Sequence, residues 1–251
     1  MHGLSYFSYD WLDIAQALGS DREAVAMDMR GFGDSDWSPT KDYSVPSMAQ
    51  DILNVLDQLG WKRAVLVGHS MGGRSTTFAA AKHPARVAGL ALIDYSPENA
   101  PAGSKRVSQI VAGTPDRFAS VDEAMSYFGS RNRERFTRYL KPVDGGYILK
   151  RDPYFRDQFR RLLETGERPK LGVDMWQLLG EVRCPMLSMR GSRSDMYAAE
   201  TVPKMKATNP RLQMVEVDAG HNIGGENPAG FLAAIRPFLS LLEKAHEHPR
   251  H

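Results

Sequence analysis

The sequence is short of the features that mark several classes of protein. Its single cysteine, Cys184, excludes a disulfide within the chain and a metal site built from several cysteines. No apolar run approaches the roughly 20 residues that span a bilayer, and the N-terminal residues lack the basic and then apolar stretches of a secretory signal. We therefore expect a cytoplasmic protein without a membrane partner.

An excess of charge of one sign is also lacking. The chain has 32 Lys and Arg against 30 Asp and Glu, a formal net charge of +2, whereas nucleic-acid binding usually requires a strongly basic surface. Of its 251 residues, 42% are hydrophobic and 25% are charged, which is typical of a globular protein with a full core. These values exclude a disordered chain and give no basis for a nucleic-acid partner; they leave the oligomeric state open.

Short apolar runs alternate with longer stretches of helical periodicity, a pattern typical of α/β proteins with a mostly parallel sheet flanked by helices. The runs predicted as strands are residues 24–28, 64–68, 87–94, 185–190 and 212–217. The stretches predicted as helices are 9–18, 47–60, 71–82, 198–207 and 228–242.

Residues 95–181 interrupt this alternation, because a crossover between parallel strands usually takes only about 30 residues. Helical patterns recur within them at 120–128, 131–139 and 154–164. The sequence thus predicts a core of residues 1–94 and 182–251 with a helical cap of residues 95–181. Residues 131–161 contain ten Lys and Arg against four Asp and Glu, which indicates either a solvated helical face or a basic rim that attracts an acidic substrate.

The strongest local motif is Gly68-x-Ser70-x-Gly72, which follows one predicted strand and precedes a predicted helix. A serine on so sharp a turn is strained, and side chains at the two glycine positions would collide. The turn exposes the Ser70 hydroxyl at the positive end of the helix, and the Met71 N–H points to where an oxyanion would form. These features favour a nucleophile over glycines that serve only strand–helix packing.

A serine nucleophile requires a general base that a third group orients. His221 is the best candidate, because it follows the last predicted strand, at the edge where parallel sheets place their sites. Two acids follow strands between the serine and the histidine: Asp195, after a glycine-led turn, and Asp94, at the end of strand 87–94. We favour Asp195 and keep Asp94 as the competitor.

These motifs, in this order, resemble the α/β-hydrolase superfamily, in particular its lid-bearing serine esterases and lactonases. The matching segments are His2-Gly3, residues 28–35, residues 68–73, Cys184-Pro185 leading to Gly191 and Asp195, and Gly220-His221. The resemblance implies that the N–H of Leu4 is the second oxyanion donor and that no cofactor or metal is needed. It implies hydrolysis of a small-molecule carboxylic ester or lactone through an acyl-enzyme. Residues that would then line an acyl pocket are Tyr127, Phe128, Tyr147, Trp176 and Met196.

Relatives of this family limit the alternatives. Haloalkane dehalogenases and epoxide hydrolases carry aspartate at the position of Ser70, so those activities are not expected. Carbon–carbon bond hydrolases and cofactor-free perhydrolases use the same triad and stay open. A non-catalytic protein that binds a small ligand in the same pocket is a further alternative.

The beginning of the chain departs from the family pattern. Only Met1 precedes His2-Gly3, whereas family members have some 20 to 30 residues there, which form the first three strands. The third of these strands would lie between the predicted strands 24–28 and 64–68. We therefore expect either a truncated chain, weakly active and easily unfolded, or a sheet edge that has been rebuilt.

Overall fold

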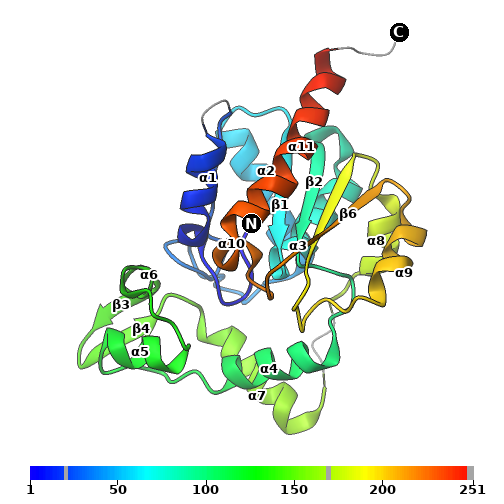
Figure 1. The fold of residues 1–251 in the computed structure, drawn as a ribbon. Helices are drawn as coiled ribbons and strands as arrows, with labels where there is room; N and C mark the ends of the chain where they lie inside the picture. The colour runs from blue at the N-terminus through cyan, green and yellow to red at the C-terminus, as the bar shows by residue number, and fades with distance from the viewer. Residues whose placement is uncertain (20–21, 168–170, 248–251) are drawn as a thin grey trace.

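The computed structural model describes residues 1–19, 22–167 and 171–247. Within them, a parallel sheet of four strands has the order β1-β2-β5-β6 (Figure 1). Its strands are β1 (Ala64–His69), β2 (Val87–Ile93), β5 (Met186–Gly191) and β6 (Leu212–Val217). All four strands were predicted from the apolar runs, and they confirm the α/β class.

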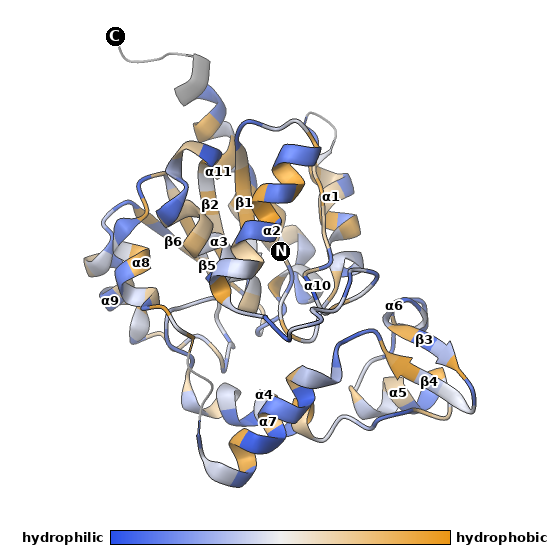
Figure 2. Ribbon diagram, turned by 180° about the vertical axis from the view of Figure 1, so that it is seen from behind, coloured by the Kyte–Doolittle hydropathy of each residue, from blue (hydrophilic) through white to orange (hydrophobic). Residues whose placement is uncertain are grey.

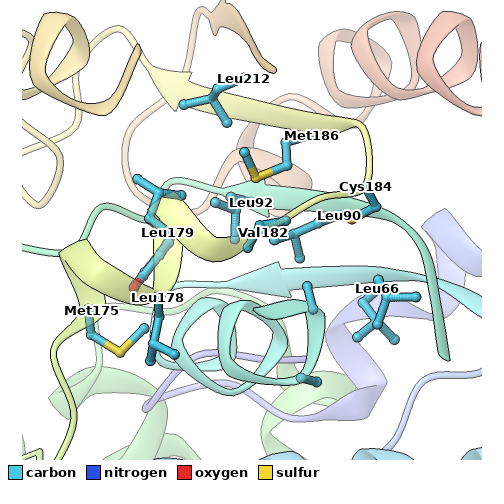
Figure 3. Packing of buried hydrophobic residues seen from close by; sticks show 14 of the residues in the cluster. Leu66, Leu90, Leu92, Met175, Leu178, Leu179, Val182, Cys184, Met186 and Leu212 are labelled. Carbon is cyan, nitrogen blue, oxygen red and sulfur yellow. The ribbon is translucent and has the colours of Figure 1, made fainter. Parts of the chain in front are cut away.

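Successive side chains of a strand point to opposite faces of the sheet, so each central strand supplies two layers of core. Leu90 and Leu92 of β2 belong to one buried cluster, together with Met186 of β5 (Figure 3). Ala91 and Ile93 belong to a second cluster on the other face. The central strands therefore read as continuous apolar runs, as in sheets covered on both faces.

Helices cover both faces of the sheet. The first face packs against α2 (Val45–Gln58), α3 (Met71–Lys82), α8 (Met175–Glu181) and α9 (Thr201–Thr208). The second packs against α1 (Leu12–Leu18) and α11 (Pro228–Glu247). The remaining short helices of this part are η1 (Ser8–Trp11), η2 (Pro84–Arg86) and α10 (Ile223–Glu226).

Hydropathy follows this layering (Figure 2). The strands β1 and β2 are mostly hydrophobic, whereas α4 (Pro101–Ala112) and α7 (Pro153–Thr165), which lie away from the sheet, carry many hydrophilic residues. The long helix α11 alternates between both kinds, as expected for a helix with one buried face. Among the described residues, no helix is both long and apolar enough to cross a membrane.

The prediction of a strand over residues 24–28 is wrong. These residues join no ladder among the described parts of the chain, and Val25 is 48% exposed. The outer edge of β1 is instead contacted by Met1, whose amino group donates to the Val67 carbonyl at 2.7 Å and whose carbonyl accepts from the His69 N–H at 3.0 Å. An apolar run becomes a strand only where a neighbouring backbone offers partners for its N–H and C=O groups.

Residues 101–165 form the part that lies beside the sheet, below it in Figure 1. Besides α4 and α7, it contains α5 (Val121–Tyr127), α6 (Arg133–Tyr139) and an antiparallel hairpin of β3 (Leu140–Val143) and β4 (Gly146–Leu149). The three helices predicted here are present, but the hairpin was missed, so this part is not purely helical. Helix α8, which falls in the predicted cap, packs into the core cluster through Leu178 and Leu179.

Candidate active site

Ser70 lies at the sharp turn between β1 and α3 that the motif predicts. Its backbone has φ 51° and ψ −116°, a conformation that is strained for a residue with a side chain. A Cβ at Gly68 would lie 2.3 Å from Thr76 Oγ1, and one at Gly72 would lie 2.7 Å from the His2 carbonyl oxygen. Both glycines are therefore required for β1, α3 and the N-terminal loop to approach one another around the serine.

His221 pairs with Asp94. The Nδ1 atom of His221 lies 2.6 Å from Asp94 Oδ2, and the Asp94 side chain is fully buried. The same carboxylate accepts a hydrogen bond from the Ser194 hydroxyl and, at 2.8 Å, from the Gly191 N–H. These two donors fix its orientation, and an acceptor at Nδ1 holds an imidazole so that Nε2 is free to face a nucleophile.

The expectation that Asp195 orients His221 is wrong. The Asp195 carboxylate forms a two-pronged ion pair with Arg106 of α4, at 2.6 and 2.8 Å, and its side chain is 36% exposed. This pairing, chiefly the hydrogen bond from Arg106, lowers the pKa of Asp195. The loop after β5 thus turns Ser194, not Asp195, toward the histidine.

The backbone explains why Asp94 reaches the site. Asp94 follows β2 directly, and its φ of 42° is rare for a residue with a side chain. β5 lies between β2 and β6 in the sheet. The Asp94 carboxylate, at the end of β2, contacts both the Gly191 N–H at the end of β5 and His221, which follows β6. One sequence signal was available: Asp94 is the first residue after a strand, whereas Asp195 stands four residues beyond Gly191.

His69, beside the serine, supports the other histidine. Its Nε2 lies 2.9 Å from the His221 carbonyl oxygen, and the two rings are 4.7 Å apart. The ring is 3% exposed, and burial lowers its pKa well below the ordinary range, so it is neutral. We find it packed between the elbow and the His221 loop, where it fixes the position of that backbone.

A cavity of about 860 Å³ opens at the ends of the strands, and Ser70 and His221 both line it. Leu4 and Met71 also line it. The two residues predicted as oxyanion donors therefore line the same cavity as Ser70, and their N–H groups have no acceptor among the described residues.

The predicted pocket residues divide into two groups. Tyr127, Phe128 and Met196 line the cavity. Tyr147 instead exchanges backbone hydrogen bonds with Phe118, and Trp176 lies under the Lys204 ammonium group, 3.8 Å from its ring centroid. Aromatic residues in this region thus serve both the cavity and the packing around it.

Comparison with known proteins agrees with this architecture. The alpha/beta hydrolase fold family matches residues 1–126. A 3-hydroxybutyrate-oligomer hydrolase of Cupriavidus necator is 31% identical over 255 residues, which cover 94% of this chain and 86% of that protein. The chain belongs to the α/β-hydrolase fold family, and it is an enzyme of the hydrolase class.

Two further relatives bear on the same point. Esterase YbfF of Escherichia coli is 27% identical over 252 residues, which cover 96% of this chain and 91% of the esterase. The crystal structure of an E-2-(acetamidomethylene)succinate hydrolase superposes with a TM-score of 0.83 at 29% identity, covering 95% of this chain and 89% of the other.

Proposed function

We propose that the protein is a serine hydrolase that cleaves a carboxylic ester or lactone through an acyl-enzyme. The observation that carries the proposal is that the strained Ser70 lines the same cavity as His221. The Nδ1 atom of His221 is in turn held by the buried carboxylate of Asp94. This set of three groups has the roles of a nucleophile, a general base and an orienting acid.

In the proposed reaction, His221 takes the proton of Ser70 as the hydroxyl attacks the substrate carbonyl. The Leu4 and Met71 N–H groups stabilise the resulting oxyanion, and His221 returns the proton to the leaving alcohol. Water activated by His221 then attacks the acyl-enzyme and releases the acid. Asp94 stabilises the imidazolium in both steps without itself accepting the proton.

The relatives support the ester assignment by what they are named for. One is named for hydrolysis of 3-hydroxybutyrate oligomers and another is an esterase. We extend the proposal to the cap: residues 101–165, which supply Ser104, Tyr127 and Tyr154 to the wall, cover the cavity and select the substrate.

A fluorophosphonate probe tests the reactive serine. Wild-type protein should label rapidly and Ser70→Ala should not, because only an activated serine reacts quickly with this probe. Ser70→Ala should also lose ester hydrolysis, by up to roughly a millionfold, since the members of a triad act as a unit. Turnover above about a tenth of wild type would contradict the assignment.

A substrate panel separates the proposal from its alternatives. Short acyl esters, long acyl esters and lactones should include at least one good substrate. An unlabelled serine with tight binding of a small molecule would favour a non-catalytic protein. A labelled serine without activity on the panel would favour carbon–carbon bond hydrolysis or perhydrolysis by the same groups.

A further inference from the structure

Five cationic side chains of the described residues line the cavity, and three of them are paired with carboxylates. Lys41 lies 2.8 Å from Asp152 and Arg106 lies 2.6 Å from Asp195. The third neutralised cation is Arg135, which is 2.6 Å from the Asp10 carboxylate.

Arg151 is different from these cations. It follows β4, lines the same cavity and is 4% exposed. Among the described residues, no carboxylate lies within ion-pair distance of it, and its Nη1 has no hydrogen-bond partner. Its Nη2 donates to Thr114 Oγ1 at 3.0 Å. Burial lowers the pKa of Arg151 to about 10, so the guanidinium is still protonated at neutral pH.

The surroundings fix this charge in place. The Thr114 hydroxyl donates to the Ile110 carbonyl at 3.1 Å, which leaves its lone pairs for Arg151. The Arg151 backbone bridges to Phe32 and donates to the Leu149 carbonyl at 2.7 Å. The backbone of Arg151 is therefore fixed, and one guanidinium nitrogen, Nη2, is bound to Thr114 while Nη1 is unpaired.

A buried cation without a counter-charge is costly unless something else supplies the charge. The fork of an arginine matches a carboxylate, which accepts two parallel hydrogen bonds from it. Other basic residues of segment 131–161 do not need such a ligand, because Arg133, Lys150 and Arg156 pair with aspartates whose side chains are at least 58% exposed. Their charges are thus neutralised outside the cavity. In the cavity wall, Arg74 of α3 also lacks an ion pair with a described carboxylate, but it is only half-buried, whereas Arg151 is almost fully buried and has an unpartnered Nη1.

We propose that Arg151 is a carboxylate-binding residue of the substrate cavity, and that the substrate is an ester that also carries a free carboxylate. This inference rests on the proposed function, since it places the ester carbonyl at Ser70 and the carboxylate at Arg151. Substrates of this class are monoesters of dicarboxylic acids, with the carboxylate in the acyl part, and esters of hydroxy acids, with it in the alcohol part.

The test compares mono-4-nitrophenyl glutarate with its methyl ester, which has the same acyl chain without the charge. Wild-type protein should show a higher kcat/KM for the anionic ester. Arg151→Met should lower that preference at least tenfold, mainly through KM, and Arg151→Lys should lower it less. Acetylated 3-hydroxybutyrate and its methyl ester repeat the comparison with the carboxylate in the alcohol part.

Arg161→Gln is the matched control. Arg161 lies in the same basic segment, on α7, but its side chain is 68% exposed and pairs with Glu167. It should leave the preference unchanged, because it acts only through the screened surface field. An equal loss in Arg161→Gln and Arg151→Met would overturn the subsite in favour of general steering.

Binding measurements keep the inference independent of turnover and of folding. Calorimetry should detect monomethyl glutarate, but not dimethyl glutarate, on Ser70→Ala, and adding Arg151→Met should abolish that binding. Removing an unpaired buried charge should not lower the melting temperature of the ligand-free protein, whereas a structural role would lower it. Hydrolysis of both esters without any preference, or equal binding of both glutarates, would overturn the subsite while leaving the proposed function intact. Carboxylate binding that depends on Arg151, without labelling of Ser70, would support the subsite and refute the proposed function.

Discussion

At the scale of single residues, the site depends on the buried carboxylate of Asp94, which accepts hydrogen bonds from two groups besides His221. Asp94 accepts from the Gly191 N–H and the Ser194 hydroxyl before it meets His221. Its position leaves little freedom for the imidazole, which is what an orienting acid requires. Asp195 instead forms an ion pair with Arg106.

Asp94→Asn should therefore lower kcat far more than Asp195→Asn. An amide at position 94 can donate to Nδ1 and so favour the wrong tautomer of His221, which in a serine protease triad costs on the order of ten-thousandfold. Asp195→Asn should cost less than about tenfold, since it removes only a half-exposed ion pair. Steady-state kinetics on one ester decide the ranking, and the reverse order would return the acid role to Asp195.

A second prediction at this scale concerns pH. His2 is fully buried; its Nε2 accepts from the Met29 N–H at 2.9 Å and its Nδ1 lies 2.8 Å from the Gly3 carbonyl oxygen. Burial lowers its pKa from 6.5 to about 4, so the unfolded chain binds a proton more readily than the folded one. The contribution of His2 to the free energy of unfolding should be complete above about pH 6.5 and should fall by about 3 kcal/mol as the pH drops toward 4. Burial also lowers the pKa of the Met1 amino group from 8.0 to about 5, which adds a loss of the same sign that begins near pH 8.

Urea unfolding at pH 7.5 and pH 4.5 measures this loss. His69 is also buried and neutral, and its lowered pKa adds a loss of the same sign. In His2→Gln, an amide that does not titrate replaces the ring, so the difference between the two pH values should shrink. An unchanged difference in that variant would show that His2 does not contribute.

At the scale of elements, β1, the elbow and α3 act as one unit. Gly68→Ala should destabilise this unit by about 1–3 kcal/mol, because the new Cβ would press on Thr76 Oγ1 and the Gly72 carbonyl. It should also lower kcat/KM about a hundredfold, since displacing a nucleophile by about 1 Å has that effect. Denaturant unfolding and ester kinetics give the two readouts.

Gly60→Ala is the matched control for this substitution. Gly60, at the end of α2, has a positive φ of 69°, unlike Gly68, but a Cβ there has nothing within 4 Å. It should cost about 1 kcal/mol of stability through backbone strain alone and leave the kinetics unchanged. Similar kinetic losses in both variants would contradict the packing argument.

At the scale of the whole molecule, the part beside the sheet is fastened to the core by polar contacts as well as by apolar ones. Asp10 of η1 accepts a hydrogen bond from Tyr139 of α6, and Arg135 Nε lies 2.6 Å from both the Asp10 Oδ1 and the Tyr139 hydroxyl. The rings of Phe7 and Tyr139 also contact each other, with centroids 4.2 Å apart and planes tilted by 52°. This junction closes one side of the cavity.

Asp10→Asn should loosen this junction, because it leaves the half-buried Arg135 without a counter-charge. We expect a loss of about 2 kcal/mol and faster amide exchange in α6 and the β3–β4 hairpin than in the sheet. Asp122→Asn is the control. It removes an ion pair with Arg133, which lies on α6 like Arg135, but both side chains of this pair are more than 60% exposed. Equal exchange in both variants would argue against a fastening role for Asp10.

Features that depend on neighbouring residues could be predicted from the amino-acid sequence. The four strands of the sheet, helices α2 and α3, and the serine elbow were predicted because periodicity and glycine spacing act within a few residues. His221 was found for a related reason: its loop follows the last strand, and parallel strands end at a common edge.

The other features could not be predicted, because they depend on contacts between residues far apart in the chain. Asp94 and Asp195 both follow strands, and only the packing of β2, β5 and β6 turns one of them toward His221. Residues 24–28 are apolar enough for a strand, but they pair with no strand in the described part of the chain. Arg151 is one of ten basic residues in its segment, and only the folded cavity wall removes it from water and from every described carboxylate. A buried charge indicates a ligand only when no neighbouring group neutralises it, and those neighbours come from distant parts of the chain.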